Sequence, residues 1–176
     1  MSERWFIGDT HFGHRGIVTY EPTARPFANV EEMNEELISR WNARVSMDDK
    51  VYHLGDFCLN RSSLAIARRL NGRKILIMGN HDVFRTHEYL DVGFERLCGS
   101  LQFENLILTH VPVHPNQLEH RFFANVHGHL HSHKLPDWRY LNVSCENTDL
   151  APITLEEVYS RIMEERQKVD VQDIHE

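Results

Sequence analysis

Residues 75–82 read Ile75-Leu76-Ile77-Met78-Gly79-Asn80-His81-Asp82, an unbroken apolar run followed at once by polar side chains. A short run without polar alternation is expected of a parallel strand that is covered on both faces. Gly79 and Asn80 end the run, because both residue types favour turns. This stretch therefore predicts a buried strand of an α/β protein, with polar groups at its carboxyl end.

The same order, a short apolar run and then an oxygen or imidazole group, occurs at four other places. These are Asp9-Thr10-His11, Gly55-Asp56, Thr109-His110 and Gly128-His129-Leu130-His131. In open α/β sheets, sites lie beyond the carboxyl ends of the strands. Carboxylates, an amide and several imidazoles are what a pair of divalent metals needs, and two metals about 3.5–4 Å apart support in-line displacement at phosphorus. The fragments together predict a hydrolase of phosphate esters.

Each fragment alone is a weak indication of metal binding. Asp after Gly is ordinary turn chemistry, and a lone histidine at a strand end, such as His110, is commonly held by a hydrogen bond. The segment Gly128-His129-Leu130-His131 is stronger, because a spacing of two places both rings on one side of an extended chain. His127 and His133 share that spacing. Spacing alone therefore leaves open which two of the four bind metal.

Composition narrows the class of protein. The 176 residues are 41% apolar and carry 19 basic and 26 acidic side chains, for a net charge of -7. This length forms one full core, and the absence of a basic stripe argues against extended nucleic-acid binding. The three scattered cysteines are typical of reduced, packed thiols. No leader pattern and no membrane-length apolar run is present, so we expect a cytoplasmic protein without a membrane partner and leave its oligomeric state open.

Hydrophobic spacing predicts alternating strands and helices in the first half of the chain. Strands are expected at 5–8, 51–54 and 75–78, a loop at 12–28, and helices at 29–45, 64–70 and 86–90. A hairpin of strands 97–103 and 106–108, strands at 122–126 and 140–143, and a helix from Thr154 to about Gln167 complete the list. The first strands predict a parallel sheet and the later ones a second, largely antiparallel sheet. Residues 168–176 are predicted to fray.

In this order and at these strand ends, D-x-H, G-D, G-N-H-D, T-H and G-H-x-H resemble the motifs of the calcineurin-like metallophosphoesterases. The motifs run from Asp9 to His131, and the flanking elements extend the resemblance to almost the whole chain. The resemblance implies an α/β fold, a four-layer α/β/β/α sandwich of two mixed β-sheets flanked by helices. It also implies a single domain, 1–176, with a dinuclear metal site at the carboxyl ends of the strands.

The resemblance further implies a role for each motif residue. One metal would be held by Asp9, His11, Asp56 and His131, and the other by Asp56, Asn80, His110 and His129. Mixed nitrogen and oxygen ligands favour first-row transition metals, so we expect manganese first, with iron, zinc and nickel as alternatives. A metal-bridging hydroxide would attack phosphorus in line, His81 would protonate the leaving group, and Asp82 would orient His81.

Other residues beside the motifs are candidates for supporting roles. The alignment with the family places His127 behind the ligands, and His53 is a candidate support for Asp56, although a strand histidine held by the backbone is an equal interpretation. His14, Arg15 and Arg121 lie in loops that follow motifs. These three residues are candidate substrate contacts. For Arg15 and Arg121 the reason is that arginine clamps phosphate through two parallel hydrogen bonds, and solvated surface charge is the alternative.

The motifs also narrow the substrate class. The chain has G-N-H-D where serine/threonine protein phosphatases typically carry G-N-H-E, and Gly55-Asp56-Phe57-Cys58 lacks their D-R-G continuation. We therefore expect a phosphodiesterase or phosphatase of small phosphoesters, nucleotides among them. A nuclease or nucleic-acid end-processing phosphatase is the first alternative. A catalytically silent, metal-stabilised scaffold is the second, and it is disfavoured because every ligand position is filled.

Overall fold

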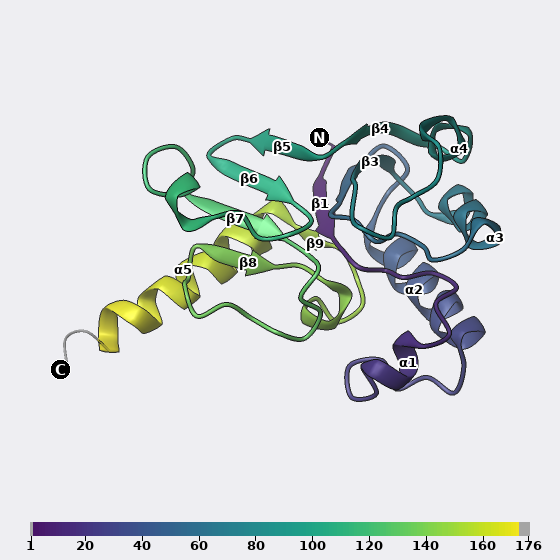
Figure 1. The fold of residues 1–176 in the computed structure, drawn as a ribbon, viewed down its shortest axis with the longest axis horizontal. Helices are drawn as coiled ribbons and strands as arrows, with labels where there is room; N and C mark the ends of the chain where they lie inside the picture. Colours follow the sequence, from purple (N-terminus) through teal and green to yellow (C-terminus); the bar gives the residue numbers. More distant parts are fainter. Residues whose placement is uncertain (1, 173–176) are drawn as a thin grey trace.

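Two mixed β-sheets form the centre of the protein (Figure 1), in a computed structural model that describes residues 2–172. The first sheet has the order β4-β3-β2-β1-β9, with β1 to β4 parallel and β9 antiparallel to β1. Its strands are β1 (Arg4–Ile7), β2 (Lys50–His53), β3 (Arg73–Ile77), β4 (Phe94–Cys98) and β9 (Ile153–Thr154). The second sheet, β5-β6-β7-β8, comprises β5 (Ser100–Phe103), β6 (Leu106–Thr109), β7 (Ala124–His127) and β8 (Tyr140–Asn142).

Helix α2 (Val30–Arg44) covers the outer face of the first sheet. Its apolar stripe, which includes Met33, Leu37 and Trp41, packs in one cluster with Trp5 and Val51 of β1 and β2. The helix begins as predicted, because the Asn29 side chain accepts a hydrogen bond from the Glu32 amide at 2.8 Å. The first part of the chain also contains four shorter helical segments, namely α1 (Ile17–Tyr20), α3 (Arg61–Leu64), a 3₁₀ segment (Ala65–Arg69) and α4 (Thr86–Asp91).

The inner faces of the two sheets share a second apolar cluster. Phe6 and Ile77 of the first sheet lie in it with Leu108 and Val126 of the second. Helix α5 (Leu155–Gln172) contacts β1, β8 and β9 and adds Val158 to the same cluster. The strands of the first sheet are thus buried on both faces, as their apolar sequences require. Two mixed sheets flanked by helices confirm the predicted fold class.

Two predictions about the later strands were wrong. Residues 97–103 do not form one strand: the chain breaks at Gly99, so that β4 ends the first sheet and β5 begins the second. The second sheet is not largely antiparallel, because only β5 and β6 run antiparallel, whereas β6, β7 and β8 are parallel. The connections between these parallel strands carry no long helix, and for this reason the consecutive strands were predicted to be largely antiparallel.

Smaller differences concern the boundaries of elements. The predicted loop 12–28 contains α1, and the predicted helix 64–70 is a helical turn followed by the 3₁₀ segment. The predicted strand at Phe122 begins at Ala124, since Phe122 packs on the outer face of the second sheet with Ile107 and Leu118. Helix α5 opens with the predicted capping pair of Thr154 and Glu157 and continues past Gln167 to Gln172. Residues 173–176 of the predicted frayed tail lie outside the described residues.

Within residues 2–172, no helix has both the length and the apolar composition needed to cross a membrane.

The three cysteines are free, and Cys58 and Cys145 are buried. Cys58 belongs to the apolar cluster under α2, and burial raises the pKa of its thiol to about 12. It is therefore packed as a neutral group.

Candidate metal centre

The predicted ligands converge at one edge of the two sheets. Asp9 follows β1, Asp56 follows β2 and Asn80 follows β3, while His110 and His129 follow β6 and β7. The first three strands are parallel to one another, and so are the last two. Parallel strands bring their carboxyl ends to the same edge, which explains why motifs far apart in sequence meet in space.

Five of the seven predicted ligands have an unusual backbone conformation. The φ angles of Asp9, His11, Asp56, His129 and His131 are 54°, 49°, 54°, 70° and 48°. A left-handed conformation in a non-glycine residue costs about 1–3 kcal/mol and persists only where surrounding contacts enforce it. Five such residues at one edge indicate that the fold holds these side chains in place against a local preference.

Asp9, His11 and His131 form the first cluster, in which one ligand atom of each lies within 4.8 Å of the others. Nε2 of His11 lies 3.8 Å from Oδ1 of Asp9. Oδ2 of Asp9 accepts hydrogen bonds from the Ser144 hydroxyl at 2.8 Å and the His129 amide at 2.9 Å. Burial by itself would raise the pKa of Asp9, but the contact with His11 and the nearby imidazoles lower it. Asp9 is therefore a fixed, ionised carboxylate.

Asp56, His110 and His129 form the second cluster. Nδ1 of His110 donates to the Leu54 carbonyl at 2.8 Å, so in the neutral ring the lone pair is on Nε2. That nitrogen lies 3.4 Å from Oδ2 of Asp56 and 3.2 Å from Nδ1 of His129. Asn80, which is exposed, approaches the same Nε2 with its Oδ1 at 3.0 Å. Four electron-pair donors thus converge on one point.

Asp56 connects the two clusters. Its Oδ2 lies 3.6 Å from Nε2 of His11 in the first cluster and 3.4 Å from Nε2 of His110 in the second. Its Oδ1 accepts a hydrogen bond from the His81 amide at 2.8 Å. Burial opposes ionisation of Asp56, but without metal a protonated His110 ring, through its hydrogen bond and its charge, and the hydrogen bond from the His81 amide lower the pKa of Asp56 to about 2. The same oxygen therefore faces both clusters as an anion.

This donor set fits divalent cations. Nε2 of His11 is buried between the carboxylates of Asp9 and Asp56 and has no hydrogen-bond partner among the described residues. Burial lowers the pKa of His11, which favours the neutral imidazole that binds metal. Converging lone pairs repel one another unless a positive charge lies between them. Both clusters have the nitrogen and oxygen donors that first-row transition metals prefer.

Asp82 does not have the predicted contact with His81. Its Oδ2 accepts from the amides of Asp56 at 2.7 Å and Gly79 at 2.9 Å, and its Oδ1 accepts from the Phe57 amide at 3.1 Å. Burial raises the pKa of Asp82 to about 6, although the hydrogen bonds from these amides act in the opposite direction. The prediction that Asp82 orients the His81 ring is corrected accordingly: Asp82 ties the loop after β2 to the loop after β3.

His81 and His14 lie beside the clusters. The ring centre of His81 is 5.4 Å from that of His11, and the ring centre of His14 is 5.2 Å from His11 and 6.5 Å from His81. Burial and the neighbouring imidazoles lower the pKa of His14 to about 4. Tyr20, at the end of α1, places its ring 6.1 Å from His14 and is 73% exposed. This group forms the open side of the centre.

Of the two candidate arginines, Arg121 lies outside this group. Arg121 donates to the Gln102 side chain on β5 at 2.9 Å and lies over the ring of Phe122. That ring belongs to the outer cluster of the second sheet, so the prediction that Arg121 contacts substrate is not supported by its position. Arg15 is exposed. The sequence could not separate these side chains from ordinary surface charge.

His53 and His127 are buried behind the ligands. Nε2 of His53 lies 2.9 Å from the Thr10 hydroxyl, which donates its own proton to the Phe57 carbonyl at 2.8 Å. Nε2 of His53 must therefore be the donor, and the ring supports the loops of Asp9 and Asp56 rather than Asp56 itself. Nδ1 of His127 lies 2.8 Å from the Gly128 carbonyl. Burial lowers the pKa of His127 to about 4.

Sequence reasoning missed an ion pair next to the first cluster. Arg25 and Glu146 have fully buried side chains and lie 2.7 Å apart, and Glu146 also accepts from Nδ1 of His131 at 3.0 Å. An arginine in a loop and a glutamate far along the chain resemble solvated charges, so no local pattern marks them. Their burial reveals the pair, because unpaired charges are excluded from protein interiors.

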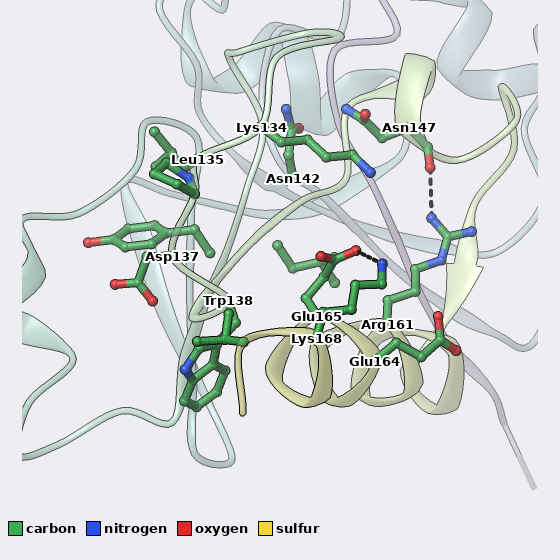
Figure 2. A pocket seen from close by; sticks show the side chains of 14 residues that line it. Lys134, Leu135, Asp137, Trp138, Asn142, Asn147, Arg161, Glu164, Glu165 and Lys168 are labelled. Atoms are coloured by element: carbon green, nitrogen blue, oxygen red, sulfur yellow. Dashed lines mark hydrogen bonds and ion pairs between the residues drawn. The ribbon is translucent and has the colours of Figure 1, made fainter. Parts of the chain in front are cut away.

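A cavity of about 440 Å³ lies between α5 and residues 134–142 (Figure 2). Arg161 of α5 donates to the Asn147 carbonyl at 2.7 Å, and Lys168 pairs with Glu165 at 2.7 Å. The side-chain amide of Asn147 in turn donates to the His131 carbonyl at 2.6 Å. The lining residues include none of the seven predicted ligands. The cavity therefore lies behind His131 rather than at the cluster.

The fold and the two clusters define the class, and comparison with known proteins agrees. The chain belongs to the calcineurin-like phosphoesterase family, whose model matches residues 4–175. This confirms the predicted family. The family implies divalent metal ions, and the two clusters are the candidate sites for them.

Individual relatives extend this comparison. An uncharacterised protein of Methanocaldococcus jannaschii is 36% identical over 169 residues, which cover 89% of each chain. The crystal structure of a protein of unknown function from Aquifex aeolicus is similar with a TM-score of 0.72 and 26% identity, over 91% of this chain and 99% of that one. Pseudomonas putida nuclease MPE has a TM-score of 0.52 and 20% identity, over 73% and 61% of the two chains. The last likeness shows the fold alone.

Proposed function

We propose that this protein is a two-metal phosphodiesterase or small-molecule phosphoesterase that acts on small phosphoesters, nucleotides among them. The position of Asp56 carries the proposal. One carboxylate oxygen within 3.6 Å of a histidine in each cluster is the arrangement expected of a ligand shared by two cations. In this proposal Asp9, His11, Asp56 and His131 hold one metal, and Asp56, Asn80, His110 and His129 hold the other.

The metal pair supplies charge and water activation. When bound, two cations of this kind neutralise phosphate oxygens and make a water molecule acidic enough to attack at neutral pH. Manganese is our first expectation among manganese, iron, zinc and nickel, because the donors are mixed nitrogen and oxygen groups. The chain itself keeps the carboxylates of Asp9 and Asp56 ionised and the His11 ring neutral, as metal binding requires. It also fixes these side chains through left-handed backbone conformations.

His81 is the proposed general acid. Its amide is anchored on Oδ1 of Asp56 at 2.8 Å, and its ring faces those of His11 and His14 at the open side of the centre. A protonated imidazole at that position donates to the leaving oxygen as the phosphorus–oxygen bond breaks, which leaves the alcohol or phenol neutral. Because Asp82 is occupied by backbone amides, His81 performs this step without a carboxylate partner from that loop.

The substrate side of the centre favours small esters. His14 and the exposed ring of Tyr20 lie next to the clusters, whereas the candidate Arg121 is held on β5. A net charge of -7 argues against tracking a long polyanion. Nuclease or nucleic-acid end-processing activity is the alternative function. A cytoplasmic location remains our expectation.

A hydrolysis panel tests the proposal. Purified protein is stripped with chelator, reloaded with Mn²⁺, Ni²⁺ or Zn²⁺, and assayed with an aryl phosphomonoester, an aryl phosphodiester, a 2′,3′-cyclic nucleotide and an oligonucleotide. We expect turnover of the small diester that disappears with chelator and returns with metal. Turnover that survives chelation refutes the two-metal mechanism, and cleavage of the oligonucleotide alone favours the nuclease. Failure of every substrate in Mn²⁺ supports a silent scaffold.

A further inference from the structure

Arg25 holds the backbone of the first ligand loop from inside the protein. Its Nη1 donates to the Thr10 carbonyl at 3.0 Å and its Nη2 donates to the Asp9 carbonyl. The loop needs such a restraint, because both Asp9 and His11 have left-handed backbone conformations. The flat guanidinium group with five donors reaches two successive carbonyls at once, which a lysine ammonium group cannot reproduce.

Glu146 holds the third ligand of the same cluster from the other side. Its Oε1 accepts from Nε of Arg25 at 2.7 Å and lies 3.0 Å from Nδ1 of His131. A carboxylate paired with arginine is ionised and only accepts hydrogen bonds, so Nδ1 of His131 carries the proton. The lone pair of the neutral ring is then on Nε2. One carboxylate thus sets the orientation and the tautomer of His131.

We propose that the Arg25–Glu146 ion pair is a positioning device for the metal held by Asp9, His11 and His131. It fixes the backbone of Asp9 and Thr10, immediately before His11, and the ring of His131, and both of its side chains are fully buried. The inference rests on the proposed metal-binding role of these ligands. Carboxylates behind ligating histidines commonly raise metal affinity by orienting the ring.

The second cluster has a separate support. Asp82 accepts hydrogen bonds from the amides of Asp56, Phe57 and Gly79, and neither Arg25 nor Glu146 contacts these three amides. The ion pair therefore contacts residues of the first cluster alone, whereas Asp82 supports the loop of the shared ligand Asp56. Loss of the ion pair is therefore expected to weaken one metal site selectively, whereas a general loss of stability weakens both.

Metal titration of the intact protein tests this inference. Metal-free wild type, Glu146→Gln and His131→Ala are titrated with Co²⁺, with calorimetry for affinity and the visible spectrum for the ligand environment of each ion. We expect wild type to bind two ions and Glu146→Gln to lose about 10–100-fold in affinity for one of them. His131→Ala should weaken the same ion, and adding Glu146→Gln to it should not weaken the remaining site further. Glu146→Asp, which keeps the charge, should restore part of the affinity.

A matched variant separates positioning from stability. Asp49 is buried at the opposite edge of the first sheet and accepts from the amides of Glu3 and Ser46 and from the Trp5 indole. Asp49→Asn should lower the melting temperature without altering either affinity. Equal weakening of both ions by Glu146→Gln, or no weakening, overturns the inference. Wild-type protein that binds no Co²⁺ refutes the proposed function as well, so the two failures are distinguishable.

Discussion

Acidification should destabilise the protein through His53. Burial lowers the pKa of His53 to about 3, whereas an unfolded histidine titrates near 6.5. Because the folded pKa is depressed, the contribution of His53 is fully present above pH 6.5 and is lost as the pH falls toward 3. At about 1.36 kcal/mol per pKa unit, the free energy of unfolding falls by about 2 kcal/mol between pH 7 and pH 5 from this group alone.

The double variant Thr10→Ala/His53→Phe isolates this contribution. His53 is packed between Trp41 and Phe57, so a phenyl ring suits the site, and removal of the Thr10 hydroxyl makes room for it. The Phe57 carbonyl keeps its hydrogen bond from the Phe12 amide at 3.0 Å. Thr10→Ala alone is the control and keeps the acid sensitivity.

Urea unfolding of metal-free protein at pH 7 and pH 5 measures the effect. Wild type and Thr10→Ala should lose stability on acidification by about 2 kcal/mol more than the double variant does. The remaining histidines titrate in all three proteins, so their contributions cancel in the comparison. An equal loss in all three proteins would refute the claim that His53 is buried in its neutral form.

Three further predictions concern the proposed site. His81→Ala should reduce hydrolysis of alkyl esters by about 10²–10⁴-fold and affect aryl esters with good leaving groups much less, with two metals still bound; equal losses for both ester types contradict a general acid. Asp82→Asn places an amide group against backbone amides and should lower the free energy of unfolding by about 2–4 kcal/mol in urea; an unchanged midpoint would be inconsistent with its three hydrogen bonds. Tyr20→Ala should raise KM for nucleoside and aryl esters over methyl esters, with rescue by Tyr20→Phe, and a uniform change in KM argues against stacking on this exposed ring.

The sequence predicted well which side chains lie together in the two clusters, for a physical reason. A short apolar run such as residues 75–78 must be buried, and its polar successors must then lie at the sheet edge. Five motifs in one order therefore indicated the candidate centre and identified the family. Spacing could not show which histidines in 127–133 face the clusters, because that depends on which rings form hydrogen bonds with the backbone. Nδ1 of His127, for example, bonds the Gly128 carbonyl.

Contacts between distant residues escaped prediction. Arg25 and Glu146 are separated by 121 positions, and each is an ordinary charged residue in its local sequence. The same limit applies to residues 94–103, where only the packing of two sheets reveals that β4 and β5 belong to different ones. Asp82 looked like the partner of His81 because it is its neighbour, but the three amides around it compete successfully for its oxygens.

The role of Asp56 is the central claim, and metal stoichiometry tests it most directly. Chelator-treated wild type and Asp56→Asn are titrated with Mn²⁺ by calorimetry under identical conditions. We predict two equivalents for wild type and the loss of tight binding of the pair in the variant, because one carboxylate oxygen faces both clusters. Two tightly bound equivalents in Asp56→Asn would contradict the account.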